Sequence, residues 1–519
     1  MLYDYSQPLF RSEYNGCKST GCPNCGISDL TRYQPSTRLG YAAYHCPLCD
    51  AYPPVLLNEP IQALNQQITQ SHFQPAKWLT LVCDCQPYFA ESYWTRYGQT
   101  KAGSKRFKCQ QCGTVKTAVN SKKYQATLQP WLDALFEGDT PAQLQAKLGL
   151  NSKLFYQRLI QMSELLEACS RRFEQQYFGA FSDLTLQTRS HILNCRSGLT
   201  TPLSKQNESS KQNELSKPNE LSKSTHLWLL STAESHSGYQ LLITHNLLDK
   251  NQLAAFPLAQ QGQYKLETKE AEITQTNQVL LRAERTYQKI LARSQFDQLA
   301  YADAKYSQHS DGVLLRPVYA AHSHMQHLKY LLKNTNSLFL LLEHESFLRG
   351  SAIFTFMPES VITPKINLFY IHTHQHKKMK NTQVKSRKFS AKNSENPLVK
   401  SLSWWQEKWL GFEHDYAGKY WSVGIGSLTR KPEITQQKIQ TLVTTQPNWQ
   451  EDFWLAFDEW LPYEQRNKMS SKYLFHWLNI FRFIHNRSCD LSNLISVNQA
   501  SPFDRKSIEE LIEYQAVFY

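Results

Sequence analysis

Cys22-Pro-Asn-Cys25 and Cys46-Pro-Leu-Cys49 decide how this chain begins to fold, and 20 residues separate the two pairs. Each pair fits one tight turn, and the loop between them can bring the two turns together. Four thiolates at this spacing are typical of a tetrahedral zinc site. The sequence therefore predicts a first zinc ribbon at residues 1–60, in which Cys22, Cys25, Cys46 and Cys49 bind the metal.

A second set of cysteines follows the same plan. Cys83-Asp-Cys85 is separated from Cys109-Gln-Gln-Cys112 by 23 residues. Its first pair is a less usual zinc turn, because Cys-x-x-Cys is the commoner spacing. We expect a second zinc ribbon at residues 78–120, with these four cysteines as ligands. Metal binding supplies much of the folding free energy of modules this small, on the order of 10–16 kcal/mol.

Disulfide bonds are the alternative for these cysteines, and they require an oxidising compartment. Residues Met1 to Phe10 lack the basic and apolar regions of a signal peptide. No run approaches about 18 uncharged apolar residues, so no membrane span is expected. We therefore favour zinc, a cytoplasmic location and no membrane partner. Cys17 is an alternative ligand of the first site, although a free thiol is the favoured interpretation there.

Length and charge indicate several domains and an anionic partner. A chain of 519 residues is too long for one core. Its formal net charge of +13 attracts polyanions, of which nucleic acid is the commonest. The second ribbon adds a basic tip, in which Lys105, Arg106 and Lys108 could contact phosphates. A solvated hairpin is the alternative interpretation of that tip.

A helix-turn-helix pattern follows at residues 125–172. Thr140 and Pro141 are typical of a helix start, and Gly149 permits a turn before a second helix. The exposed side chains expected on that second helix include Lys153, Gln157 and Arg158. Side chains at these positions could reach a major groove. A helical hairpin that does not contact DNA is the alternative.

Residues 173–370 alternate between apolar strand-like runs and helices, which predicts a mixed sheet covered on both faces. The acids associated with three such runs are Asp183, Asp303 and either Glu343 or Glu345. The run with Asp183 is expected to span Tyr177–Leu186. Acids that meet at one edge could hold two Mg²⁺ ions for attack on a phosphodiester. Unrelated surface acids are the alternative. A six-residue repeat at 200–225 predicts a disordered insertion.

The C-terminal third begins with a basic stretch. From residue 372 to 400 there are eight Lys or Arg and one acid, Glu395. We expect a flexible linker at 371–403 that could follow a phosphate backbone. Residues 404–519 should complete or extend the preceding domain, with an amphipathic helix at Lys468–Asn486 and a final short helix.

Two zinc ribbons, a helix-turn-helix and an RNase H-like domain, in this order, resemble the zinc-ribbon DDE transposases of bacterial insertion sequences. Cys22-Pro-Asn-Cys25-Gly, Tyr44-His-Cys46-Pro-Leu-Cys49 and Arg106-Phe-Lys-Cys109-Gln-Gln-Cys112-Gly are similar to the ribbons of that family. His476–His485 resembles the helix that closes its catalytic domain.

The resemblance implies a catalytic triad of Asp183, Asp303 and Glu345, with two catalytic Mg²⁺ ions beside the two structural Zn²⁺ ions. It also implies double-stranded DNA as the partner, a homo-oligomer on that DNA and a nucleoid-associated protein. Ala304 departs from the family pattern, because a Gly often follows the second acid. Three functions therefore stay open: an active transposase, a transposase-derived DNA-binding regulator that does not cleave, and a zinc-ribbon RNA-binding protein.

Overall fold

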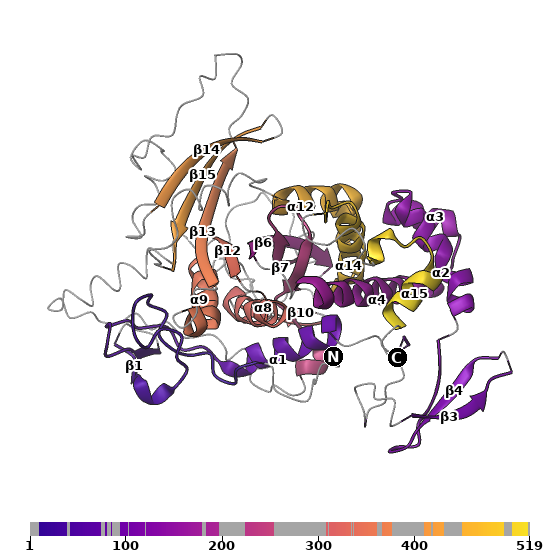
Figure 1. The fold of residues 1–519 in the computed structure, drawn as a ribbon, viewed down its shortest axis with the longest axis horizontal. Coiled ribbons are helices and arrows are strands. Elements are labelled where there is room, and N and C mark those ends of the chain that lie inside the picture. The colour runs from indigo at the N-terminus through magenta and orange to yellow at the C-terminus, as the bar shows by residue number, and fades with distance from the viewer. Residues whose placement is uncertain are drawn as a thin grey trace, which may run out of the picture.

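A large mixed sheet organises the protein (Figure 1). Its seven strands lie in the order β14-β15-β13-β12-β6-β7-β8. Their bounds are β6 (Asp183–Arg196), β7 (Ser224–Glu234), β8 (Gln240–His245), β12 (Ser337–Glu343), β13 (Ile366–Gln375), β14 (Trp409–Tyr416) and β15 (Lys419–Ser427). β12 runs parallel to β6 and β13, and the other neighbouring pairs are antiparallel. The predicted α/β architecture with a mixed sheet is confirmed.

This computed structural model describes residues 10–38, 42–73, 78–79, 85, 94–101, 103–119, 121–178, 183–196, 224–253, 308–309, 311–333, 335, 337–360, 366–375, 409–416, 419–429, 449–492 and 501–516. Cys83, Asp303 and most of the predicted insertion at 200–225 lie outside the described residues. β13 continues to Gln375, so the start of the predicted linker at 371–403 is strand.

Helices cover the sheet and pack beside it. The longer ones are α1 (Asn58–Ile68), α2 (Ser121–Phe136), α3 (Pro141–Leu148), α4 (Ser152–Tyr177), α8 (Pro317–Leu331), α9 (Ser346–Ser360), α12 (Trp449–Trp460), α14 (Ser471–Arg487) and α15 (Ile508–Ala516). The short helices are η1 (Leu30–Arg32), η2 (Thr69–Phe73), α5 (Lys250–Leu253), α13 (Tyr463–Arg466) and η9 (Pro502–Asp504). None of the described helices is long and apolar enough to cross a membrane.

Side-chain alternation along β7 assigns helices to the two faces of the sheet. Trp228 packs edge-on against Phe347 of α9, with ring centroids 5.6 Å apart. Ser231 lies three residues further along and donates to Gln450 of α12 at 2.7 Å. An odd spacing places the two side chains on opposite faces, so α9 and α12 lie on opposite sides of β7.

The segment from α2 to α4 has the local signals of two successive helices. Thr140 and Gln143 form a capping box at the start of α3. Gly149 has φ 57°, a left-handed conformation that glycine adopts without strain, and Asn151 caps α4. α4 then continues to Tyr177, well beyond a short recognition helix.

The predicted strand Tyr177–Leu186 is wrong in its first half. The helical spacing of buried apolar side chains persists to Phe173, which keeps the chain in α4 up to Tyr177. β6 begins at Asp183, so this acid starts a strand. The helices predicted at Lys468–Asn486 and in the tail are confirmed as α14 and α15.

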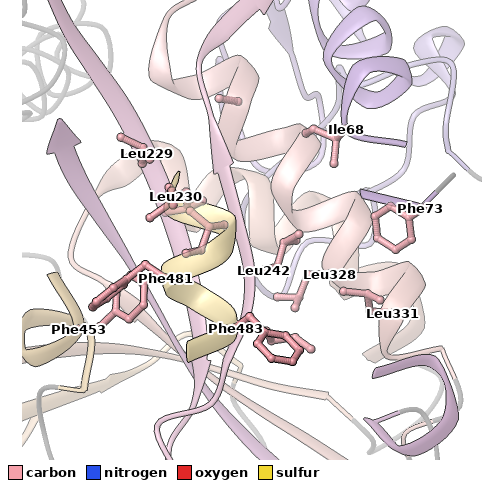
Figure 2. Close-up of a cluster of buried hydrophobic side chains, with 14 of the residues drawn as sticks. Ile68, Phe73, Leu229, Leu230, Leu242, Leu328, Leu331, Phe453, Phe481 and Phe483 are labelled. Atoms are coloured by element: carbon pink, nitrogen blue, oxygen red, sulfur yellow. The ribbon is translucent and has the colours of Figure 1, made fainter. Parts of the chain in front are cut away.

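One cluster of buried apolar side chains joins α1, α2, α4, α8, α9, α12, α14 and α15 to the sheet. Phe453 of α12 and Phe481 of α14 lie 5.3 Å apart between ring centroids, and Phe73 lies 5.6 Å from Tyr330 of α8. Figure 2 shows members of this cluster, among them Leu328 on α8 and Phe481 on α14. The described helices therefore share a core with the sheet.

Three smaller sheets lie outside the large one. They are β1 (Gln34–Ser36) with β2 (Ala43–His45), β3 (Trp94–Gln99) with β4 (Lys105–Cys109) and β5 (Val115–Thr117), and β9 (Leu247–Asp249) with β10 (Gln308–His309) and β11 (Gly312–Leu314). Figure 1 shows β3 and β4 standing well away from the large sheet. The first two small sheets carry the cysteine clusters.

Candidate metal centres and nucleic-acid interface

Four thiols meet beside β1 and β2. The Sγ atoms of Cys17, Cys22, Cys46 and Cys49 all lie within 4.8 Å of one another, and we call this group the first cysteine cluster. The Cys17 and Cys49 Sγ atoms are 3.5 Å apart, and those of Cys22 and Cys46 are 3.8 Å apart. Sulfurs at about 2.3 Å from a tetrahedral zinc ion are about 3.8 Å apart. The first cysteine cluster can therefore bind zinc.

This cluster contains Cys17 where the sequence predicted Cys25. The two cysteines pair as a parallel bridge, and the Gly26 N–H donates to the Cys17 carbonyl at 2.8 Å. Cys25 is buried within the main hydrophobic cluster, whereas Cys17 lies in a small separate one with Tyr33 and Cys46. Packing against the main core thus takes Cys25 out of the thiol group, and Cys17 completes it.

Serine substitutions distinguish these two assignments. We expect Cys17→Ser to lower the zinc content from two ions per chain to one, because a hydroxyl is a poor replacement for a thiolate. Cys25→Ser should keep both ions. Metal analysis of the purified full-length variants measures this difference. Equal zinc loss in the two variants would contradict the assignment of Cys17.

Contacts with α9 hold the first cysteine cluster in place. Arg11 donates to the Gly26 carbonyl at 2.9 Å and to the Phe354 carbonyl of α9 at 3.3 Å. Gly16 lies at this contact, where an added Cβ would be 2.3 Å from the Ile27 carbonyl oxygen and 3.0 Å from the Phe354 ring. The chain therefore requires glycine there, and the cluster is held against α9.

Three thiols form a second group, the second cysteine cluster. Cys85, Cys109 and Cys112 have Sγ atoms within 4.8 Å of one another, and Cys85 and Cys109 are 3.6 Å apart. Trp94 and Phe107 pack around them. These thiols can also bind zinc, and Cys83, the fourth predicted ligand, lies outside the described residues.

The strands beside this cluster carry only positive charge. We call residues 94–119, with β3, β4 and β5, the basic sheet. Six Lys or Arg and no Asp or Glu occur in it. Of the predicted phosphate contacts, Lys105 and Lys108 are exposed and Arg106 is half-buried. Sequence reasoning missed Tyr97, which is 51% exposed and lies within 5.5 Å of the Arg106 and Lys108 cations, measured from its ring centroid.

The predicted DNA contacts of the helical segment lie near the start of α4. Lys153 and Gln157 are exposed and four residues apart, so they share one face of the helix. Arg158 is half-buried and donates to the Gln161 side chain at 2.8 Å. Behind them, Phe155 packs against Trp131 of α2 at 4.7 Å between ring centroids.

The structure does not bring Asp183 and Glu345 together. In the parallel pair β6–β12, Asp183 lies opposite Ser337, the first residue of β12. Glu345 lies two residues beyond Glu343, the last residue of β12, and the six steps from Ser337 to Glu343 span about 20 Å. The two acids therefore lie at opposite ends of the paired strands β6 and β12. The expectation that these acids meet at one edge is therefore wrong for Asp183 and Glu345, because β6 begins at Asp183.

An arginine, Arg189, lies close to Glu343, the last residue of β12. Arg189 donates to the Thr373 hydroxyl of β13 at 2.8 Å, and Glu343 accepts from the Ser190 N–H at 2.9 Å. Burial lowers the pKa of Arg189, and Glu343 and Glu451 act in the opposite direction. A fixed cation here opposes binding of Mg²⁺. Among the described residues, only the two cysteine clusters group three or more potential metal ligands.

Comparison of the chain with known protein families, with curated proteins and with solved structures finds no match. The candidate functions therefore depend on the residues of this chain.

Proposed function

We propose that this protein binds DNA through the basic sheet and does not cleave it through the Asp183, Asp303 and Glu345 triad. The observation that carries this proposal is the absence of any acid from residues 94–119, together with six cations, five of them on three short strands. Such a surface attracts phosphates without competition from its own carboxylates. Zinc in the second cysteine cluster would hold the strands in place.

Duplex DNA is the partner that best fits the surroundings of the basic sheet. α2 begins two residues after it and places Lys122 and Lys123 on exposed positions, so the positive surface continues onto a helix. The exposed Lys153 and Gln157 of α4 belong to the same helical segment. Phosphate contacts from both segments would fix how the protein sits on a duplex.

Neutralising the basic sheet tests the proposal. We expect Lys105→Gln, Arg106→Gln and Lys108→Gln together to weaken binding of a labelled duplex roughly 10- to 100-fold, because three phosphate contacts are lost. Fluorescence anisotropy measures the dissociation constant.

A matched control removes three other exposed or half-exposed cations. Arg32→Gln, Lys147→Gln and Lys333→Gln change the net charge equally, and Lys147 already pairs with Glu137 at 2.6 Å. Equal weakening by both triple variants would mean that net charge alone drives binding and would contradict the proposed surface. RNA that competes better than the duplex would favour the RNA-binding alternative.

The transposase is the second candidate, and one observation favours it. β6, β7 and β8 form an antiparallel meander, and β12 and then β13 continue the sheet in parallel from β6. This order supports the expected RNase H-like sheet. The separation of Asp183 from Glu345 argues against the cleavage chemistry. DNA cutting or joining with Mg²⁺ that Asp303→Asn abolishes would overturn the inactive assignment.

A further inference from the structure

Tyr97 lies at an irregular point of the basic sheet. The register of β3 against β4 shifts between Arg96 and Gln99, and Gly98 has φ 90°. An extra residue on one strand is a β-bulge, which turns the neighbouring side chain out of the regular pattern. Glycine makes this conformation accessible without a Cβ clash. Tyr97 therefore lies within the irregular part of β3.

The ring takes no part in the small core of the basic sheet. Trp94 and Phe107, the other large aromatic side chains of residues 94–119, pack with Cys109 around the second cysteine cluster. Tyr97 lies outside that group and is 51% exposed. Packing therefore accounts for two of the three aromatic side chains and leaves the Tyr97 ring available to a ligand.

Two cations lie close to this ring. The guanidinium carbon of Arg106 and the ammonium nitrogen of Lys108 each lie 5.5 Å from the ring centroid. These residues are two apart on β4, so their side chains leave the same face of the strand. An exposed aromatic ring with two cations nearby combines the elements that hold single-stranded nucleic acid, in which bases stack on aromatic rings and cations bind the phosphates.

We propose that Tyr97 stacks on an unpaired base, with Arg106 and Lys108 binding the phosphates on either side of it. The ligand is DNA with a single-stranded segment next to a duplex. This inference rests on the proposed DNA binding, and it adds recognition of an unpaired nucleotide. Every base has a stacking face, so the contact does not depend on the sequence of the DNA.

Abasic DNA separates stacking from phosphate binding. The probes are a blunt duplex, the same duplex with a short thymidine overhang, and the same duplex with an abasic overhang of equal length. We expect the full-length, zinc-loaded protein to bind the thymidine overhang about tenfold more tightly than the abasic one. Tyr97→Phe should keep that preference. Tyr97→Leu, which keeps an apolar side chain on the strand, should lose it.

Zinc content and the circular dichroism spectrum establish that each variant is folded. Equal binding of the thymidine and abasic overhangs by the unchanged protein would overturn the inference, while binding of the blunt duplex would leave the proposed function intact. A preference that persists in Tyr97→Leu would also overturn it. Failure to bind any of the three probes would refute the proposed function itself. An RNA overhang that outcompetes the thymidine overhang would overturn the assignment to DNA.

Discussion

Arg482→Met is expected to lower the free energy of unfolding by about 3–5 kcal/mol, because it leaves a buried charge without its partner. Arg482 of α14 donates to Glu167 at 2.7 Å and to Glu174 at 3.0 Å, both on α4. All three side chains are no more than 5% exposed. The network joins α4 to α14, and its loss should separate two helices that cover the large sheet.

The same network contains a second arginine. Arg171 donates to Glu167 at 2.9 Å and to Glu174 at 2.5 Å, so each arginine contacts both glutamates. Burial alone would raise the pKa of Glu167, but Arg482 and Arg171 hold it well below its usual value. Glu167 is therefore charged at neutral pH, whereas burial raises the pKa of Glu174. Removing Arg482 leaves the buried Glu167 carboxylate with one arginine fewer.

Urea unfolding measured at neutral pH tests this prediction. Arg482→Met combined with Glu167→Leu should be less destabilising than Arg482→Met alone, because the buried carboxylate that lost its partner is removed as well. Arg32→Met, which breaks an exposed pair with Asp29, is the control and should leave the unfolding midpoint unchanged. Unfolding curves of Arg482→Met that match those of the unchanged protein would show that the network contributes nothing to stability.

Acidification to pH 5 is expected to destabilise the fold by on the order of 2 kcal/mol for each deeply buried histidine. Burial lowers the pKa of His245, His324 and His327 to about 3. The two ring nitrogens of the buried His324 lie 2.7 Å from the Thr232 hydroxyl and 2.8 Å from the Thr244 hydroxyl. This site fits a neutral ring that donates one hydrogen bond and accepts the other.

The sign of the effect follows from proton uptake. The unfolded chain binds protons at these histidines below about pH 6.5, while the native state excludes them until about pH 3. The contribution of these neutral histidines to the free energy of unfolding is therefore complete above pH 6.5, and it is lost as the pH drops towards 3. His324→Gln can make both hydrogen bonds but does not titrate. The number of protons taken up on unfolding should therefore fall by about one, and the free energy of unfolding should depend less on pH. Identical urea midpoints at pH 7.5 and pH 5 in the unchanged protein would contradict the prediction.

Local sequence signals predicted many elements of the fold. Thr140 and Pro141 marked the start of α3, and the apolar run after Ser337 marked β12. These signals depend on neighbouring residues, which act the same way in any fold. They do not specify which end of a strand lies at which edge of a sheet. For that reason the position of Asp183 was missed, although the mixed sheet itself was predicted.

The residues of the candidate sites were harder to choose. Cys17 and Cys25 form a β-bridge, in which Cys25 packs in the main hydrophobic cluster and Cys17 in a separate small one. The spacing of the cysteines in the sequence cannot show this difference. Arg189 interacts with Glu343, which is 154 positions later in the chain, so only the tertiary fold reveals the pair. Tyr97 had a local signal, namely an aromatic residue before Gly98 in a segment without acids.

The salt dependence of duplex binding tests the central claim, DNA binding through the basic sheet, most directly. Each phosphate contact contributes about 0.9 to the slope of log affinity against log salt concentration. Comparing the unchanged protein with the variant in which Lys105, Arg106 and Lys108 are all glutamine should show a slope smaller in magnitude by about 2–3. A slope that is the same in both proteins would contradict DNA binding through the basic sheet.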